Sequence, residues 1–125
     1  NAGRFQHRAN IMRCEMSRSD IASLPQLVDA KFGGVTAAID LGEPLVASDH
    51  VDVYVSAQSF PMLEKHVAYV PHAVGHVAIR VVDDQAWPLL PEGRLVPRSA
   101  VALDLLESGD PRHWVAAEQL VAAIE

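Results

Sequence analysis

Histidine is the residue type in this chain best suited to bind a transition metal, and four of its six histidines lie between residues 50 and 76. His66, His72 and His76 form one cluster, and His50 stands between Asp49 and Val51. A zinc site requires three or four such ligands to converge from separate segments. The spacings match no compact ligand motif, so we expect these histidines to be exposed and predict neither a metal site nor a bound cofactor.

Asp29-Ala30-Lys31 has the Asp-x-Lys pattern of some metal-dependent nucleases, in which carboxylates hold magnesium and a lysine assists a water. Those enzymes place the pattern at the end of a strand, with another acid upstream. Here it falls in a segment that we predict to be helical, which favours a solvated helix face. A nuclease therefore stays an alternative, and it requires Asp29, Lys31 and a second acid to converge.

Nucleophilic and phosphate-binding sites have less support. Ser56 and Ser59 lack a glycine elbow and a paired histidine, which argues against a serine hydrolase. Gly33-Gly34 precedes a predicted helix but lacks the further glycines and the lysine of nucleotide-binding loops. We therefore predict that the protein is not an enzyme.

The elements that would position these residues predict an α+β (mixed α/β) fold, with a small sheet of three to five strands and flanking helices. In the strand predicted over residues 75–82, Val77, Ile79 and Val81 alternate inward, while His76 and Arg80 point outward. We predict helices over about 20–31, 36–41 and 60–66, and strands over 50–55, 67–70, 75–82 and 93–96.

The end of the chain predicts a helical hairpin that closes the core. Ser99 is expected to cap a helix that begins at Ala100, and Gly109 with Asp110-Pro111 ends it and starts the next. The apolar faces of the two helices follow from residues that recur at helical spacing. They are Val101, Leu105 and Leu106 in the first helix, and Trp114, Ala117, Val121 and Ile124, with Leu120 beside them, in the second.

Composition limits the class of protein. A chain of 125 residues, half of them hydrophobic and 21% charged, is expected to form one globular domain. Its apolar runs are shorter than the ~18 residues that a membrane helix needs, so we expect no membrane partner. The single cysteine, Cys14, excludes an internal disulfide and fits a reducing cytosol. We expect a cytoplasmic protein.

Charge is unevenly distributed. Residues 1–18 hold four arginines and one acid, +4 − 1 = +3, whereas residues 19–125 hold six basic residues and fifteen acids, 6 − 15 = −9. The acidic part is poorly suited to duplex DNA, because phosphates would be repelled. We expect residues 1–18 to be a basic arm or linker and residues 19–125 to be a single domain.

The predicted hairpin also carries a family resemblance. Residues 95–120, with Leu103-Asp104-Leu105, Gly109-Asp110 and Ala116-Ala117-Glu118, resemble a block found in antitoxins of the AbiE (type IV toxin–antitoxin) class. Residues 32–42 resemble the glycine-containing helix that opens the effector domain of such regulators. Family members often carry a glutamine and an aromatic residue where this chain has Ala100 and Ala102.

The resemblance implies a C-terminal antitoxin domain that binds and neutralises a nucleotidyltransferase-like toxin. Such proteins repress their own operon, and they contact DNA only through an N-terminal winged helix, which would be missing here. The acidic body would complement a basic cleft on the toxin. The candidate partner-interface residues are Arg98, Asp104, Arg112, His113 and Glu118, although Asp104 and Arg112 can equally serve as internal pairs or helix caps.

Besides the nuclease, a second alternative stays open. The chain can be the dimerisation or ligand-sensing domain of an ordinary transcription regulator. That function predicts a pocket lined by Trp87, Tyr54 or Phe60, or a symmetric apolar interface through the two final helices.

Overall fold

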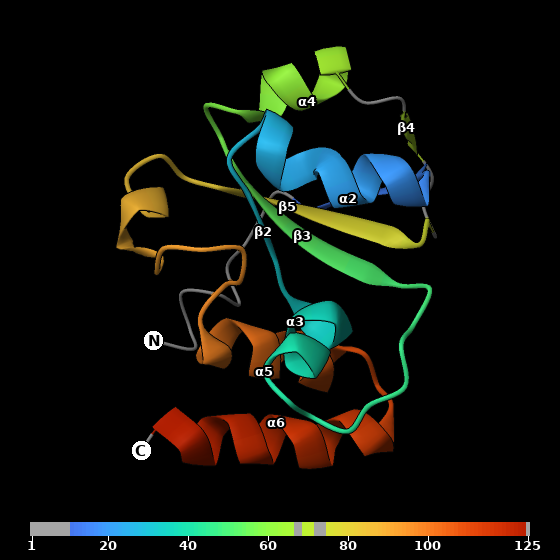
Figure 1. Cartoon of the computed structure of the whole chain (residues 1–125), viewed down its shortest axis with the longest axis vertical. Helices are drawn as coiled ribbons and strands as arrows, with labels where there is room; N and C mark the ends of the chain where they lie inside the picture. The colour runs from blue at the N-terminus through green and yellow to red at the C-terminus, as the bar shows by residue number, and fades with distance from the viewer. Residues whose placement is uncertain (1–10, 67–68, 72–74, 125) are drawn as a thin grey trace.

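The computed structural model describes residues 11–66, 69–71 and 75–124, which form a mixed five-stranded sheet with helices on both faces (Figure 1). The strand order is β2-β3-β5-β1-β4. β3 and β5 pair in parallel, and the other neighbours pair antiparallel. The strands are β1 (Ile11–Met16), β2 (Ala30–Phe32), β3 (Val51–Ser56), β4 (Tyr69–Pro71) and β5 (Val77–Val82). This architecture confirms the predicted α+β class.

The helices cover the sheet in separate layers. Figure 1 shows α2 and α4 on one face, α3 and α5 on the other, and α6 packed outside α5. α5 and α6 form the predicted C-terminal hairpin. The helices are α2 (Arg18–Leu27), α3 (Gly34–Asp40), α4 (Phe60–His66), α5 (Arg98–Glu107) and α6 (Pro111–Ile124), and a short 3₁₀ turn, η1, spans Trp87–Leu89.

One hydrophobic core lies between the sheet and the α2–α4 layer. Side chains alternate between the two faces of a strand, so Val53 and Val55 of β3 join Val77 and Ile79 of β5 on this side. α2 contributes Leu24, which is fully buried among them. The inward positions predicted for Val77 and Ile79 are therefore confirmed, whereas Val81 is only partly buried and lies outside this core.

A second core lies between the other face of the sheet and α3, α5 and α6. Small residues dominate it, with Ala100 on α5 and Ala116 and Ala117 on α6 buried at the helix contacts. Alanine allows two helices to approach closely, and Leu105 and Leu120 fill the remaining space. Burial of each such leucine stabilises the fold by about 1.5–3 kcal/mol.

The structure corrects the prediction that residues 1–18 form a basic arm or linker. Residues 1–10 lie outside the described residues, but Ile11–Met16 forms β1, between β5 and β4 inside the sheet. Cys14 is fully buried opposite Val77, and burial raises the pKa of its thiol. The period of two, with Cys14 and Met16 inward and charged residues outward, makes this arginine-containing segment a strand.

Several element boundaries also differ from the predictions. α2 ends at Leu27, and the chain continues as β2 because residues 30–32 pair with β3. Residues 93–96 form no regular strand, only a parallel bridge from Leu95 to Phe32. α5 begins at Arg98 with Pro97 as its N-cap, so Ser99 is inside the helix. The strand predicted over 67–70 corresponds to β4, and residues 67–68 lie outside the described residues.

Candidate functional site

A polar cleft of about 370 Å³ lies between the sheet and the α5–α6 hairpin. It opens beside the first residues of β3 and β5, where the parallel strands begin. Nine charged or imidazole side chains line it, from the sheet, from both helices of the hairpin and from their connecting loops. They are Arg13, His50, Asp52, His76, Arg80, Asp104, Glu107, Asp110 and His113.

Arg80 is at the centre of this cleft and is only 4% exposed, which corrects the prediction that it points to solvent. α5 covers the sheet face from which Arg80 projects. The Arg80 guanidinium donates to Asp52 and, over 3.3 Å, to Glu107, and it lies 3.7 Å from Asp104. Burial alone would lower the pKa of Arg80, but the carboxylates of Asp104 and Asp52 more than offset this and raise it.

Asp104 links the helix layer to the sheet. Its carboxylate accepts hydrogen bonds from the Tyr54 hydroxyl at 2.8 Å and from the Gly34 amide at 3.0 Å. Gly34 has a φ of 55°, which glycine adopts without strain, and it starts α3. Asp104 therefore joins α5 to β3 and to the first turn of α3, while Arg80 brings in β5. We call Asp52, Tyr54, Arg80 and Asp104 the ionic centre.

The bonding of the ionic centre indicates a structural role. Its two carboxylates are bonded by a guanidinium, a hydroxyl or a backbone amide. Among the described residues, no group of three His, Cys, Asp or Glu side chains is arranged to hold a metal ion. Within the same part of the chain, the buried Nε of Arg80 has no hydrogen-bond acceptor. The centre joins four elements through charge-assisted bonds rather than presenting a free reactive group.

The histidines near the cleft are held by the protein. The His76 Nε2 donates to the Met16 carbonyl at 3.1 Å, and the His113 Nδ1 lies 2.6 Å from the Ser108 hydroxyl oxygen. His50 is exposed at the start of β3. His72 and the side chain of His66 fall outside the described part of the chain.

The Asp-x-Lys pattern lies on a strand and not in a helix, because residues 30–32 pair with β3. Asp29 nevertheless accepts from the Ser56 hydroxyl at 3.3 Å, whereas the Lys31 amine donates to the Gly93 carbonyl and lies 5.6 Å from the Trp87 ring centre. The two side chains are engaged by different elements. The convergence that the nuclease alternative requires is not found among the described residues.

The predicted interface residues fall into two groups. Arg112 and Glu118 are exposed on α6, and Arg98 is partly exposed at the first residue of α5. Asp104 is buried in the ionic centre, which corrects its place among the surface candidates. The His113 side chain is only 14% exposed. The structure therefore leaves Arg98, Arg112 and Glu118 accessible, and it does not bring all five candidates together on one surface.

Arg112 forms a local pair with Asp110 at the start of α6. Its side chain donates to the Asp110 carboxylate at 2.8 Å, and its backbone amide donates at 2.9 Å. Both bonds lower the pKa of Asp110, to about 2, and the side-chain bond has the larger effect. The pair caps the helix as the sequence predicted for Asp110.

A carboxyl titration tests this cap. Because the pKa of Asp110 is lower in the folded protein, the cap stabilises the fold above the ordinary pKa of 3.8, and this contribution is lost as the pH falls toward about 2. In the Arg112→Gln variant, we expect the Asp110 midpoint to rise toward its ordinary value, as measured by NMR. Arg98→Gln is the matched control and is expected to leave the midpoint unchanged. An unchanged midpoint in Arg112→Gln would contradict the side-chain bond from Arg112 to Asp110.

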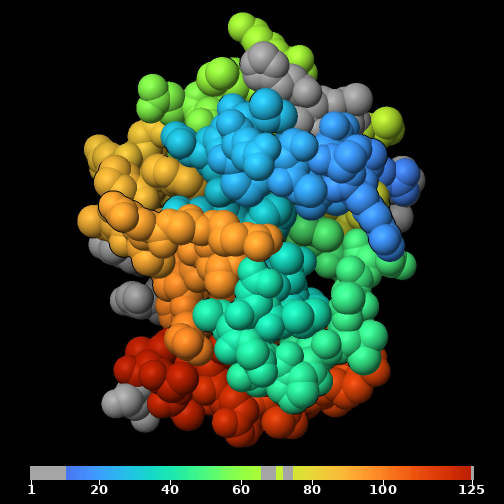
Figure 2. All heavy atoms as spheres, in the orientation of Figure 1, coloured from blue at the N-terminus to red at the C-terminus, as the bar shows by residue number. Residues whose placement is uncertain are grey.

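α6 exposes several large apolar side chains. Trp114, Val121 and Ile124 were expected to be buried, but they are 49%, 44% and 54% exposed, and Val115 is 61% exposed. The helix instead turns its small side chains and Leu120 toward α5. Figure 2 shows α6 at one end of the molecule, with its outer side uncovered. We call Trp114, Val115, Glu118, Val121 and Ile124 the α6 outer face.

A groove extends this face toward the loop before β3. It has a volume of about 660 Å³ and lies between α6 and residues 43–46. Val115 and Ala116 line one side, and Pro44, Leu45 and Val46 line the other. An apolar partner segment can therefore contact both the helix and the loop.

Sequence reasoning missed the ionic centre. On α6 it was right for Ala117 and Leu120, which are buried, and wrong for Trp114, Val121 and Ile124. Asp104 stands three and four residues after Val101 and Ala100, on the buried side of α5. That spacing was a usable signal for a buried acid. A second signal was the pairing of opposite charges, Asp52 and Arg80, on the same face of two neighbouring strands.

The comparisons with known proteins give no family. No protein-family model matches the chain, and searches of curated proteins and of solved structures find no similar protein. None of the helices described here is long and apolar enough to span a membrane. The candidate function therefore rests on the residues themselves.

Proposed function

We propose that this chain is the non-enzymatic, toxin-binding domain of an AbiE-like antitoxin and that it neutralises a nucleotidyltransferase-like toxin by binding it. The observation that carries the proposal is the exposed apolar α6 outer face. This face begins inside the block of residues 95–120 that resembles such antitoxins. Neutralisation would then result from occupancy of the toxin, without any chemical step.

The composition of the α6 outer face supports a protein partner. Contiguous exposed apolar surface is uncommon on monomeric proteins and marks interaction sites. Trp114 is half exposed, and tryptophan is the residue type most enriched among those that dominate binding energy. Val115 and Val121, on the same helix, are also exposed and can add apolar area to the contact.

Charge supports a basic partner. Glu118 is exposed within the α6 outer face, and residues 19–125 carry six basic residues against fifteen acids. A toxin that handles nucleotides or RNA presents a basic cleft, which such a surface would complement. As in autorepressing regulators of this kind, DNA would be contacted by a separate winged helix, and the complex would form in the cytoplasm.

Co-expression with the nucleotidyltransferase-like protein of a neighbouring reading frame tests this function. The wild-type chain is expected to co-purify with the toxin and to restore growth. Trp114→Ser is expected to weaken binding by about 30-fold or more, because truncation of a central aromatic residue removes at least ~2 kcal/mol. Growth would then no longer be restored.

Leu89→Ser is the matched control, because Leu89 is also exposed but belongs to η1. We expect this variant to bind like the wild type. Absence of a complex at micromolar concentrations of the wild-type chain would refute toxin binding. Equal loss in both variants would refute the assignment of the surface.

The same face also favours a second candidate, the dimerisation domain of a transcription regulator. A symmetric contact between two α6 outer faces would bury the same apolar residues. Sedimentation separates the two functions: a dimer that Trp114→Ser dissociates supports dimerisation, and a monomer that binds the toxin supports the antitoxin. The predicted pocket does not support ligand sensing through Tyr54, because Tyr54 is buried in the ionic centre.

A further inference from the structure

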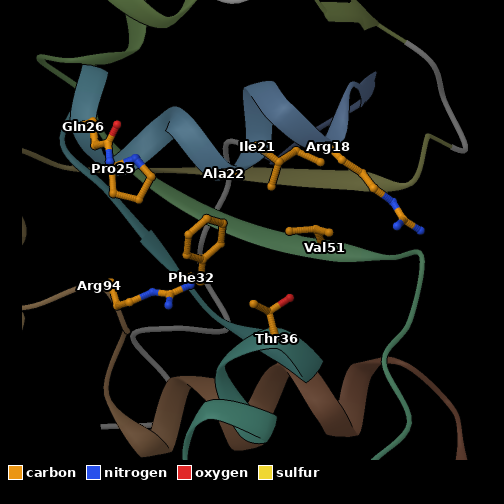
Figure 3. Close-up of a pocket in the computed structure, with 9 residues that line it drawn as sticks. All are labelled: Arg18, Ile21, Ala22, Pro25, Gln26, Phe32, Thr36, Val51 and Arg94. Atoms are coloured by element: carbon orange, nitrogen blue, oxygen red, sulfur yellow. The ribbon is translucent and has the colours of Figure 1, made fainter.

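A second hollow, which we call the α2–α3 cleft, lies in front of β2 and β3 and has a volume of about 570 Å³ (Figure 3). α2 forms one wall and α3 the other. Its lining residues are Arg18, Ile21, Ala22, Pro25, Gln26, Phe32, Thr36, Val51 and Arg94. None of these nine residues belongs to α5 or α6, so the cleft is separate from the α6 outer face.

The floor and one wall of the cleft are apolar. Phe32 and Val51, from the neighbouring strands β2 and β3, form the floor, and Figure 3 shows Phe32 near its centre. Ile21, Ala22 and Pro25 form the α2 wall. Such a surface suits a flat hydrocarbon body, and the volume lies in the range of about 300–1,000 Å³ typical of small-molecule sites.

The charged groups of the cleft are both positive. Arg18 and Arg94 lie on opposite sides of the floor in Figure 3, and none of the nine lining residues is acidic, although the whole chain has a net charge of −6. Asp40 pairs with Arg94, so among the described residues Arg18 supplies the uncompensated positive charge, which is opposite in sign to the net charge of the protein. This uncompensated charge selects an anionic ligand and disfavours a cationic one.

The two arginines differ in how they are held. The Arg94 guanidinium lies 5.4 Å from the centre of the Phe32 ring, and Asp40 pairs with it at 3.2 Å. It is thereby oriented over the floor, and its planar fork can still bind a carboxylate. Arg18 is exposed and has no ion-pair partner within the described part of the chain. One guanidinium is thus preorganised and the other is free to close over a ligand.

We propose that the α2–α3 cleft binds a small organic anion with a flat apolar body. The body packs against Val51 and Pro25, above the buried Phe32 ring, and the carboxylate pairs with Arg94 or Arg18. Thr36 and Gln26 offer polar groups at the rim. This ligand site is independent of the proposed toxin binding, because it uses different elements.

An amide NMR titration of the full chain with the naphthylacetate ion tests the site. We expect saturable shifts at Phe32, Thr36 and Val51, and binding about tenfold tighter than that of neutral naphthylacetamide, which has the same shape but no charge. Arg18→Met and Arg94→Met are each expected to weaken binding of the anion by about fivefold to tenfold. Ala22→Trp, at an exposed position of the α2 wall, is expected to abolish it by filling the cleft.

Arg112→Met is the matched control, because it removes the same charge from α6 and is expected to leave binding unchanged. Circular dichroism verifies that each variant is folded, and Arg18 is exposed, so its replacement leaves the core intact. The absence of saturable shifts at millimolar anion would overturn the proposal. Equal affinity for the acid and the amide, or an equal effect of Arg112→Met, would overturn it as well.

Discussion

Replacement of Asp104 by alanine is expected to lower the free energy of unfolding by about 3–5 kcal/mol, the effect of breaking a buried ion pair by removing one partner. The side chain of Asp104 is fully buried, and its carboxylate is bonded to the Tyr54 hydroxyl and the Gly34 amide beside Arg80. Without it, a hydroxyl and an amide lose their acceptor, and the buried guanidinium loses a counter-charge. Urea unfolding, followed by tryptophan fluorescence, measures the change.

A milder substitution at the same position and a control at an exposed aspartate test this prediction further. Asp104→Asn keeps the shape and one acceptor but removes the charge, so we expect a smaller loss of about 2 kcal/mol. Asp49→Ala is the matched control, because Asp49 is exposed, and it should change stability by less than about 0.5 kcal/mol. A loss below about 1 kcal/mol for Asp104→Ala would show that the carboxylate is not the buried link that its contacts indicate.

Replacement of Arg80 by methionine is expected to have a similarly large effect, about 3–5 kcal/mol near neutral pH. Methionine retains much of the apolar stem, but it leaves Asp52, Asp104 and Glu107 without their shared cation. Urea unfolding near neutral pH measures the loss, and a loss below about 1 kcal/mol would contradict the central place of Arg80.

An exposed ion pair serves as the comparison for the ionic centre, and a double-mutant cycle measures the coupling between Arg80 and Asp104. Arg94→Met breaks the exposed pair with Asp40 and the contact of the guanidinium with the Phe32 ring, and should cost about 1 kcal/mol. The losses in Arg80→Met and Asp104→Ala should not add, because the double variant removes both charges; we expect a coupling of about 1–3 kcal/mol. Additive losses would contradict an ionic centre held by mutual charge compensation.

Local patterns predicted much of the fold. The alternation of Val53, Val55, Val77 and Ile79 identified the two central strands, and Gly109 with Asp110-Pro111 identified the break in the hairpin. Each signal depends on residues close together in the chain. β1 carries the same alternation at Cys14 and Met16, but its place among the four arginines of residues 1–18 suggested an arm, and only its pairing with β5 defines it as a strand.

Burial could not be predicted in the same way, because it depends on elements far apart in the sequence. Arg80 alternates outward along β5, yet the helix that covers this face begins only at Arg98. Asp29-Ala30-Lys31 resembled the end of a helix until its partner strand was known. On α6, the large side chains formed a convincing core stripe, but close packing on α5 selects Ala116, Ala117 and Leu120. Tertiary contacts decided each case.

The ionic centre and the α6 outer face have complementary roles in this account. Asp104 attaches α5 to the sheet, and α6 packs on α5 through small residues. The hairpin is thus held as a rigid support, and the side of α6 that faces away from the sheet stays available for a partner. A rigid surface loses little conformational entropy on binding, which favours affinity.

Hydrogen exchange of the chain with and without the nucleotidyltransferase-like protein tests most directly whether this molecule acts by presenting α6. Added protection is expected to concentrate in Pro111–Ile124 and in residues 43–46 across the groove. Unchanged exchange in α6, or added protection confined to the polar cleft around His50 and His76, would contradict the account.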